Sequence, residues 1–188
     1  PFDNNYSEKL KKGFKCYNLL ISPKSTNPIN ELITFINLHK LYKLVGPDII
    51  CHFTIKLNIY GSFSAKFLKI PSIANITGLG TLFIRQSFMT SLSEFLYKLS
   101  LKSVTKVFFQ NKEDLKYFLE KEIITIEQTQ LLPGSGVDLN KFKFKPKVNN
   151  SDKFVFLVVS RLLADKGIYE YIDSIKLIKK FFINLSFL

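Results

Sequence analysis

Two cations lie five residues apart near the end of the chain, within residues 159–167, which read VSRLLADKG. Of the 27 Lys and Arg residues only two are arginines, Arg85 and Arg161, so an arginine here is a specific choice. An apolar run precedes Arg161, and helix-like sequence follows Lys166. This order would direct a guanidinium, an ammonium and a helix N-terminus at one anion, which predicts a diphosphate site. The alternative is a surface ion pair between Arg161 and Asp165.

A second group of polar side chains lies in residues 51–62, CHFTIKLNIYGS. His52 comes after an apolar, strand-like run, and groups of this kind hydrogen-bond hydroxyls or position a general base. The alternative is that Asn58 caps the next helix and that His52 is a satisfied histidine at a sheet edge. His39 falls inside a long helical pattern and is interpreted as structural. The other polar residues of the group are Thr54, Lys56, Tyr60 and Ser62.

Two glycine loops complete the candidate site. In NITGLGTLF, Gly78 and Gly80 permit positive φ and a close approach of a ligand to the backbone. A plain turn fits this pattern equally well, and the lack of a third glycine excludes the dinucleotide fingerprint. In LLPGSGVDLNKF, Gly136 ends a tight turn and Asp138 is placed to cap the next segment of the chain. This second loop is interpreted as a hinge whose backbone would line a cleft.

The elements that must position these residues alternate between strand and helix. Apolar strands separated by helices indicate a parallel sheet covered on both faces. The expected fold class is therefore α/β, with a Rossmann-like, doubly wound parallel sheet. A helix over residues 27–45, opened by Asn27 and ended by Gly46, is expected to bury one apolar face. That face consists of Ile29, Leu32, Ile33, Ile36, Leu41 and Leu44. The expected strands are residues 15–21, 48–53, 72–76, 106–110, 130–132, 153–160 and 184–188, and further helices are expected at 58–68, at 90–102 and after Asn111.

A polar stretch, FKPKVNNSD, divides the chain at residues 144–152 and suits a linker. We expect one nearly complete α/β domain at residues 1–143 and the first βαβ unit of a second domain at residues 153–188. The chain begins with Pro1 rather than Met and reaches Leu188 within an expected strand. It is therefore interpreted as a piece of a longer protein.

The formal net charge of +12 raises the question of a nucleic-acid partner. Nucleic-acid binding is disfavoured, because base and phosphate readout favours arginine and because the lysines are scattered. The remaining explanations are a general bias of the genome towards Lys, Ile, Asn and Phe, or attraction to an anionic membrane or to phosphorylated substrates. Cys16 and Cys51 are interpreted as buried thiols in a reducing cytoplasm. No apolar run reaches the about 18 residues of a membrane span, so we expect a cytoplasmic protein that is at most peripheral to a membrane.

Together these segments resemble the retaining glycosyltransferases of family four, which have the GT-B fold of two Rossmann-like domains facing a cleft. HFTIKLNIYGS, NITGLGTLF, VFFQNKEDLKYF, LLPGSGVDLNKF and VSRLLADKGIYEYI follow one another in the family's order. The last is the most specific, because the family has an Arg and a Lys five residues apart, followed by Gly. The likeness extends to bacterial enzymes that add N-acetylhexosamine or similar sugars to undecaprenyl-diphosphate-linked glycans. It makes residues 1–143 the acceptor-side domain and residues 153–188 the start of the domain that binds the nucleotide sugar.

The resemblance implies a role for each candidate residue. Arg161, Lys166 and Gly167 would bind the donor diphosphate and stabilise the charge that develops on it as it leaves. His52 would have the catalytic position, at the acceptor-side wall of the cleft near the transferred sugar. Neither a metal nor a cofactor is expected, because Arg161 and Lys166 would stabilise the diphosphate charge in place of a metal ion. The remaining cleft residues would be Thr54, Lys56, Asn58, Gly78, Gly80 and Gly136.

The resemblance also sets the expected partners and function. Arg85 and a basic amphipathic helix near residues 90–106 would face an anionic membrane that carries a lipid-linked acceptor. The family's pair of glutamates seven residues apart, its N-terminal strand and that strand's glycine loop have no counterpart in the chain. We therefore expect part of a glycosyltransferase of surface polysaccharide or glycan synthesis that has little or no activity alone. The alternatives are a GT-B enzyme with a soluble saccharide acceptor and a non-catalytic or degenerate α/β nucleotide-binding module.

Overall fold

The computed structural model describes residues 7–22, 25, 27–80, 83, 86–146, 154–181 and 185–187. The chain divides into two compact units, Pro1–Gly136 and Val137–Leu188. The expected linker at residues 144–152 lies mostly outside the described residues, and its bounds stay a prediction.

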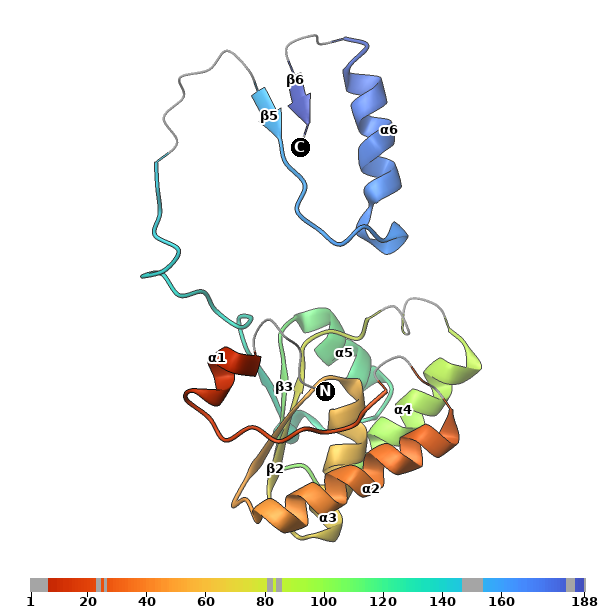
Figure 1. The fold of residues 1–188 in the computed structure, drawn as a ribbon. Helices are drawn as coiled ribbons and strands as arrows, with labels where there is room; N and C mark the ends of the chain where they lie inside the picture. The colour runs from red at the N-terminus through yellow and green to blue at the C-terminus, as the bar shows by residue number, and fades with distance from the viewer. Residues whose placement is uncertain are drawn as a thin grey trace. The chain divides into compact units, whose positions relative to one another are not determined.

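A four-stranded parallel sheet forms the centre of the first unit (Figure 1). Its strands pair in the order β1-β2-β3-β4, with Ile50 opposite Ser72 and Val107 opposite Thr129. Parallel pairing throughout confirms the predicted α/β class. The strands are β1 (Ile50–Phe53), β2 (Ser72–Ile76), β3 (Lys106–Phe109) and β4 (Thr129–Leu131).

Three helices of the first unit begin at a side-chain cap, as the sequence predicts for two of them. The side chains of Asn27, Ser87 and Asn111 accept hydrogen bonds from backbone N–H groups of the first helical turn. Each cap satisfies a donor that a helix N-terminus leaves free. Gly46 ends the second helix with φ 59°, a conformation that glycine adopts without strain. The helices are α1 (Ser7–Lys11), α2 (Pro28–Val45), the π-helix η1 (Leu57–Gly61), α3 (Ser62–Phe67), α4 (Phe88–Leu101), α5 (Lys112–Glu120) and the 3₁₀ helix η3 (Ile126–Gln128).

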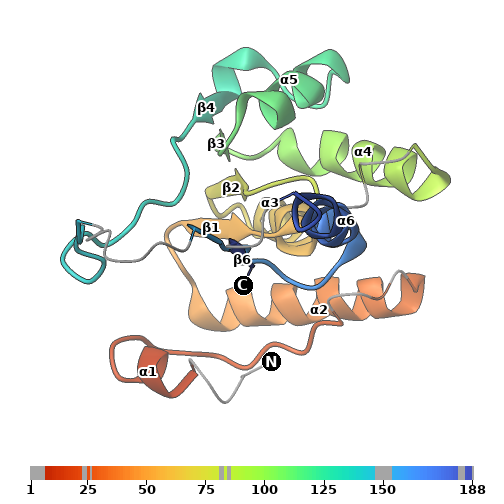
Figure 2. The same ribbon diagram turned by 90° about the horizontal axis from the view of Figure 1, so that it is seen from above.

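Helices α3, α4 and α5 lie on one face of the sheet, as the view from above shows (Figure 2). Strands that pair in sequence order require this, because right-handed crossovers all return on the same side. Side chains therefore alternate along β1, where Ile50 and His52 are buried whereas Cys51 and Phe53 are exposed. The prediction of helices on both faces is not met among the described residues, where no helix covers the second face.

An aromatic cluster fixes the helices on the sheet. Phe118 of α5 packs edge-on against Tyr97 of α4 and Phe109 of β3, with ring centroids 5.1 and 5.2 Å apart. All three side chains are fully buried. Burial of aromatic rings dominates the energetics of such a core, and edge-to-face geometry adds to it. This cluster stabilises the packing of α4 and α5 on the sheet, and so the position of the carboxyl ends of the strands.

The predicted buried face of α2 is wrong for five of its six residues, and only Leu41 is partly buried. Its buried residues are Thr34, Leu38 and Tyr42, which follow one another at intervals of four. Ile29 is 68% exposed and Leu44 76% exposed, and Leu32, Ile33 and Ile36 are exposed as well. Apolar residues occur around much of this helix, so spacing alone does not identify the stripe that the neighbouring elements cover.

Two further predictions about the first unit are wrong. Residues 15–21 form no strand in the described structure, where β1 is the edge strand and pairs with β2 alone. Cys51 is exposed and Cys16 is half-buried, so neither is a buried thiol. Cys51 projects from the sheet face that no described helix covers.

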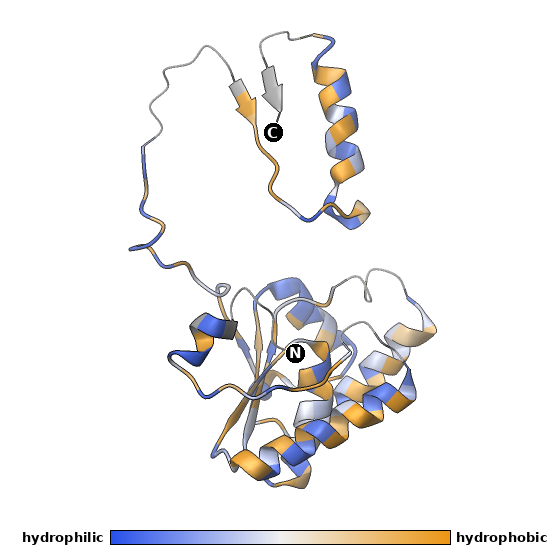
Figure 3. Ribbon diagram, in the orientation of Figure 1, coloured by the Kyte–Doolittle hydropathy of each residue, from blue (hydrophilic) through white to orange (hydrophobic). Residues whose placement is uncertain are grey.

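The second unit contains a βαβ element, as predicted. Strands β5 and β6 pair in parallel, with Phe154 opposite Leu185, and the helix between them follows a short 3₁₀ turn. Apolar residues run along β5 and the segment after it (Figure 3), yet no residue of this unit whose burial is described is buried. The elements are β5 (Phe154–Phe156), η4 (Ala164–Lys166), α6 (Ile168–Ile178) and β6 (Leu185–Phe187). Across the described residues of both units, no helix is both long and apolar enough to span a membrane.

Candidate functional site

The turn after β1 is strained. Thr54 follows the strand directly and has φ 75°, a region that a β-branched residue rarely occupies. Its carbonyl oxygen accepts a hydrogen bond of 2.9 Å from the N–H of Asn58, at the start of the π-helix η1. Backbone strain and π-helical turns both occur preferentially at functional sites. The position also fits, because ligands of open parallel sheets bind at the carboxyl ends of the strands.

His52 is enclosed by its own chain and is only 2% exposed. Its Nε2 lies 2.9 Å from the hydroxyl of Tyr42, and its Nδ1 lies 3.3 Å from that of Ser62. Burial lowers the pKa of His52 to about 4, so the ring is neutral at physiological pH. This geometry matches the alternative of a satisfied histidine, whereas a catalytic role stays a prediction.

Gly61 explains how the ring fits against η1. A Cβ atom at this position would lie 2.6 Å from His52 Nε2 and 3.0 Å from the Tyr42 hydroxyl oxygen. The last residue of the π-helix must therefore be glycine for the backbone to pack on the imidazole. His52, Tyr42 and Ser62 thus position the turn that carries Thr54.

Asn58 connects two strand ends instead of capping a helix. Its buried side chain donates a hydrogen bond of 3.0 Å from Nδ2 to the carbonyl oxygen of Asn75, near the end of β2. The Oδ1 atoms of Asn58 and Asn75 are both buried, and the described residues supply no hydrogen bond to either by geometry. Burial raises the pKa of the neighbouring Tyr97 hydroxyl, which therefore stays protonated. The end of β1 and the start of the first glycine loop are thereby joined.

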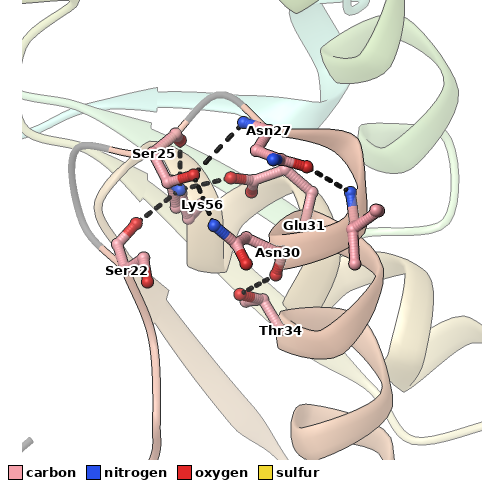
Figure 4. A network of polar contacts seen from close by, with 8 residues as sticks. Ser22, Ser25, Asn27, Asn30, Glu31, Thr34 and Lys56 are labelled. Carbon is pink, nitrogen blue, oxygen red and sulfur yellow. Dashed lines mark hydrogen bonds and ion pairs between the residues drawn. The ribbon is translucent and has the colours of Figure 1, made fainter.

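Lys56 is half-buried and hydrogen-bonded within the chain (Figure 4). Its Nζ donates to the carbonyl oxygens of Ser22 and Ser25, each at 2.7 Å, and to Glu31 Oε1 at 2.5 Å. The structure therefore places this predicted cleft residue in a network with the entry to α2.

The glycines of both loops have the expected left-handed backbone. Gly78 has φ 144°, Gly80 has φ 68° and Gly136 has φ 77°. A Cβ atom at any of the three would meet no atom of the described residues within 4 Å, so their backbone is open to that part of the chain. Because β1, β2 and β4 are parallel, the loops that follow them lie at the same edge of the sheet. The structure thus brings Thr54, Gly78 and Gly80 to one edge, whereas Arg85 lies outside the described residues.

Arg161, Lys166 and Gly167 all belong to the second unit. Arg161 is exposed in the segment after β5, and the described residues place no carboxylate within ion-pair distance of it. Lys166 ends η4, with its Nζ 3.9 Å from Asp165 Oδ2, and Gly167 has φ 72° at the start of α6. The proposed pair of Arg161 with Asp165 is therefore wrong, since Asp165 pairs with Lys166. The guanidinium is available to an anion.

The two groups differ in the chemistry that they offer. The sheet edge of the first unit has a hydroxyl and open glycine backbone, which suits a ligand rich in hydroxyl groups. The turn of the second unit has two cations and a helix start, which suits an anion. Among the described residues, no three His, Cys, Asp or Glu side chains gather in a way that would hold a metal ion.

Sequence reasoning missed Tyr42 and Glu31. Tyr42 lies ten residues before its partner His52, and Glu31 lies twenty-five before Lys56. Both belong to α2, so only the packing of that helix beside η1 brings them to these partners. Unlike a capping residue, neither has a local pattern that reveals its partner.

Solved structures show the same fold. The Anabaena protein Alr3699/HepE, crystallised in complex with UDP and glucose, matches 89% of this chain with a TM-score of 0.64 and 15% identity. The chain covers 45% of that structure. The S. aureus protein MnaA, in its co-structure with UDP, matches 89% of the chain with a TM-score of 0.54 and 16% identity, and the chain covers 48% of it. These likenesses establish a Rossmann-like α/β fold of the kind found in GT-B proteins.

The sequence places the chain more narrowly. The model of the family Glycosyl transferase 4-like matches residues 3–111, and the chain belongs to this family. It is 30% identical over 193 aligned residues to the N,N'-diacetylbacillosaminyl-diphospho-undecaprenol alpha-1,3-N-acetylgalactosaminyltransferase of Campylobacter jejuni. It is 24% identical over 162 residues to the UDP-Gal:alpha-D-GlcNAc-diphosphoundecaprenol alpha-1,3-galactosyltransferase of Escherichia coli. The alignments cover 94% and 80% of this chain, but 51% and 41% of the relatives, so the chain spans about half of their length or less.

Proposed function

We propose that the whole protein is a retaining glycosyltransferase that transfers a sugar from a nucleotide-diphosphate sugar to a lipid-linked glycan acceptor. The observation that carries the proposal is the strained Thr54 beside the open glycines 78 and 80, at the ligand edge of a sheet in this family. Both relatives named above act on diphospho-undecaprenol glycans, which supports a lipid-linked acceptor. In this proposal the first unit binds the acceptor, with Thr54 and the glycine backbone in contact with its hydroxyl groups.

The donor side of the proposal rests on Arg161 and Lys166. Their charges would stabilise the diphosphate as the sugar leaves it, and a preorganised cation acts here without a metal ion. Gly167 has a left-handed backbone with φ 72°, which would let the chain approach the phosphates, and the nearest atom to a Cβ placed there is Glu170 Oε2 at 3.8 Å. The UDP in the two solved neighbours supports a uridine nucleotide as the first donor to test. The 188 residues alone transfer little or no sugar in this proposal, because the family's paired glutamates have no counterpart among them.

Binding of nucleotides to the whole protein tests this role of Lys166. Lys166→Ala should weaken UDP binding by about 1.5–3 kcal/mol, the range for hydrogen bonds to charged groups, or about 10- to 150-fold in Kd. Lys176→Ala is the matched control, because Lys176 is exposed on α6 and pairs with Asp173. Titration calorimetry measures both. Equal affinities of the two variants would contradict a diphosphate site at Lys166.

Peripheral contact with the cytoplasmic face of the membrane is the second part of the proposal. Phe88, Leu92 and Phe95 form an exposed apolar stripe on α4, and lysines follow near the end of that helix. An apolar stripe with adjacent lysines suits an anionic bilayer surface. Sedimentation with phosphatidylglycerol liposomes should fall when Phe88 and Phe95 are both replaced by Ser. Failure of the unchanged whole protein to sediment would favour a soluble acceptor.

The alternative is a protein that is not an enzyme, namely a non-catalytic nucleotide-binding module. It predicts UDP binding that depends on Lys166 but no sugar transfer by the whole protein with any acceptor. Turnover of a UDP sugar by the whole protein therefore separates the two.

A further inference from the structure

We propose that Lys56 and Glu31 are positioning residues of the acceptor site, and that Lys56 does not itself bind the acceptor. The pair holds the strained turn at Thr54 against the entry of α2. This inference rests on the proposed function for its consequence in catalysis, but its structural part stands on the contacts of the chain alone.

Every donor of the Lys56 ammonium is already used. An ammonium has three N–H bonds, and Lys56 Nζ has three acceptors at 2.5–2.7 Å, two carbonyl oxygens and one carboxylate oxygen. The two side chains of the pair are 18% and 13% exposed for Lys56 and Glu31 respectively. A ligand hydroxyl would have to displace one of these acceptors. Lys56 therefore acts within the chain.

The acceptors of Lys56 are themselves anchored to α2 (Figure 4). Ser25 Oγ accepts hydrogen bonds from the N–H of Asn27 and from Asn30 Nδ2, at 3.2 and 2.9 Å. Asn27 in turn caps α2 through the N–H of Ile29 at 2.9 Å. The segment that Lys56 contacts is thus joined to the first turn of an 18-residue helix. The carbonyl groups that accept from Lys56 are therefore held in position by α2.

Glu31 contacts the turn after β1 at a second point. Tyr60 lies four residues after Lys56, and burial together with the neighbouring Glu31 carboxylate raises the pKa of Tyr60 to about 12. The second carboxylate oxygen, Glu31 Oε2, is buried, and no described residue meets the distance and angle of a hydrogen bond to it. Lys56 is therefore the cation that balances this buried charge, and the two residues depend on each other.

The strain at Thr54 explains why the pair matters for the site. A β-branched residue at φ 75° stays there only when the surrounding structure holds both of its sides. β1 holds one side, and the other side consists of Lys56 and the bond from Asn58 N–H to the Thr54 carbonyl. Loss of the lysine releases that side. Thr54 would then relax, and the acceptor edge would lose its geometry, whereas the turn at Lys166 belongs to the other unit.

Kinetics of the whole protein test the inference, with GlcNAc-diphosphoundecaprenol as acceptor probe and UDP-galactose as donor. Lys56→Met should raise the acceptor KM about tenfold or more, because small displacements of a positioning group are costly, and leave the donor KM unchanged. Glu31→Gln, which keeps the shape, should act in the same direction, and the double variant should be no worse than Lys56→Met. Lys56→Arg should not restore the KM, because a planar fork does not fit three converging oxygens. Lys116→Met is the matched control, since Lys116 forms an exposed pair with Glu120.

Amide hydrogen exchange of the 188-residue chain gives a readout that needs no catalysis. Residues 54–58 should exchange at least about tenfold faster in Lys56→Met and at the unchanged rate in Lys116→Met. Unchanged exchange, or an acceptor KM within twofold of the original, would overturn the inference. An acceptor KM that Lys56→Arg restores would overturn it too, because that result indicates direct binding by the charge. If the whole protein transfers no sugar from any UDP sugar to any diphospho-undecaprenol acceptor while exchange rises as expected, the proposed function fails and the positioning role of the pair stands.

Discussion

The two units share an apolar, strand-helix sequence pattern but differ in what they bury. In the first unit, Leu101, Val107, Phe109 and Phe118 have no exposed surface at all. In the second, Val159 and Leu162 are each 85% exposed, and no residue with described burial is buried. The pattern thus produces a βαβ element in both, but only the first unit packs several helices on its sheet. Strand pairing alone therefore gives topology, whereas a core requires a second layer.

The same difference separates the two parts of the candidate site. His52 and Asn58 are positioned by partners on α2, α3 and β2, and Thr54 is held through the N–H of Asn58. Arg161 and Lys166 are positioned by backbone bonds within their own turn, such as Lys166 N–H to the Leu163 carbonyl at 3.0 Å. We therefore expect substitutions to have structural effects in the first unit and mainly electrostatic effects in the second.

The largest expected effect comes from separating the units. Residues 7–136 should unfold in one cooperative thermal transition, because they contain the whole described core. Residues 137–188 should show no cooperative transition, since so small a unit without buried side chains cannot offset its conformational entropy. Circular dichroism during heating measures both. A sharp transition of residues 137–188 would show that the second unit has a core of its own.

Two phenylalanines, one from each unit, allow the contribution of packing to stability to be measured in both. Phe118→Ala removes a ring from the aromatic cluster and should cost about 3–5 kcal/mol in the free energy of unfolding. Phe181→Ala, at a position 78% exposed in the second unit, should change it by less than about 0.5 kcal/mol. Urea denaturation followed by fluorescence or circular dichroism measures both values. Equal costs would show that the second unit is packed as tightly as the first.

Acid should destabilise the first unit through His52. The pKa of His52 is about 4 in the folded chain, below the ordinary value of 6.5 that it regains on unfolding. Above pH 6.5 neither state binds the proton and there is no effect. As the pH falls from 6.5 to 4 the unfolded state binds it first, and stability drops by about 3 kcal/mol. Urea midpoints at pH 7.5 and pH 4 measure the drop.

The matched variant for this measurement is His52→Gln. Carboxylates also protonate in this range, so the quantity to compare is the pH-dependent change of each protein and not its absolute stability. His52→Gln should lose stability with acid by about 3 kcal/mol less than the original chain. The same change in both proteins would show that His52 is accessible to protons in the folded state.

A methyl group gives the smallest expected effect. Gly61→Ala should cost about 1–3 kcal/mol, because its Cβ would lie 2.6 Å from the His52 ring. Gly13→Ala is the control, since no atom lies within 4 Å of a Cβ there and φ is not left-handed. It should be neutral or stabilise the chain by up to about 1 kcal/mol. Thermal midpoints measured side by side decide between close packing at Gly61 and a looser arrangement.

The fold could be predicted from the sequence wherever the signal is local. Asn27 and Asn111 cap their helices as expected, and Gly46 ends α2, because each acts on the residues next to it. The buried face of α2 could not be predicted, since it depends on which neighbours cover a helix that is apolar on several sides. The expected strand at residues 15–21 failed for the same reason, because a strand needs a partner that its own sequence does not specify.

The sequence predicted where the candidate site of the first unit lies, but it did not predict the role of each residue in it. Thr54, Gly78 and Gly80 lie at the carboxyl edge of the sheet, as the rule for parallel sheets requires. Lys56 was expected in the cleft, whereas the structure pairs it with Glu31, twenty-five residues earlier. Pairs of this kind arise only after α2 has packed beside η1. Roles that depend on burial therefore need the structure.

Strand β1 has a practical consequence for anyone who handles this chain. It pairs with β2 alone among the described strands, so no described strand covers its other edge, next to the exposed Phe53. Such an edge is a template on which another strand can add. Concentrated solutions should therefore oligomerise through it, and a lysine in place of Phe53 would be the simplest way to keep the protein monomeric.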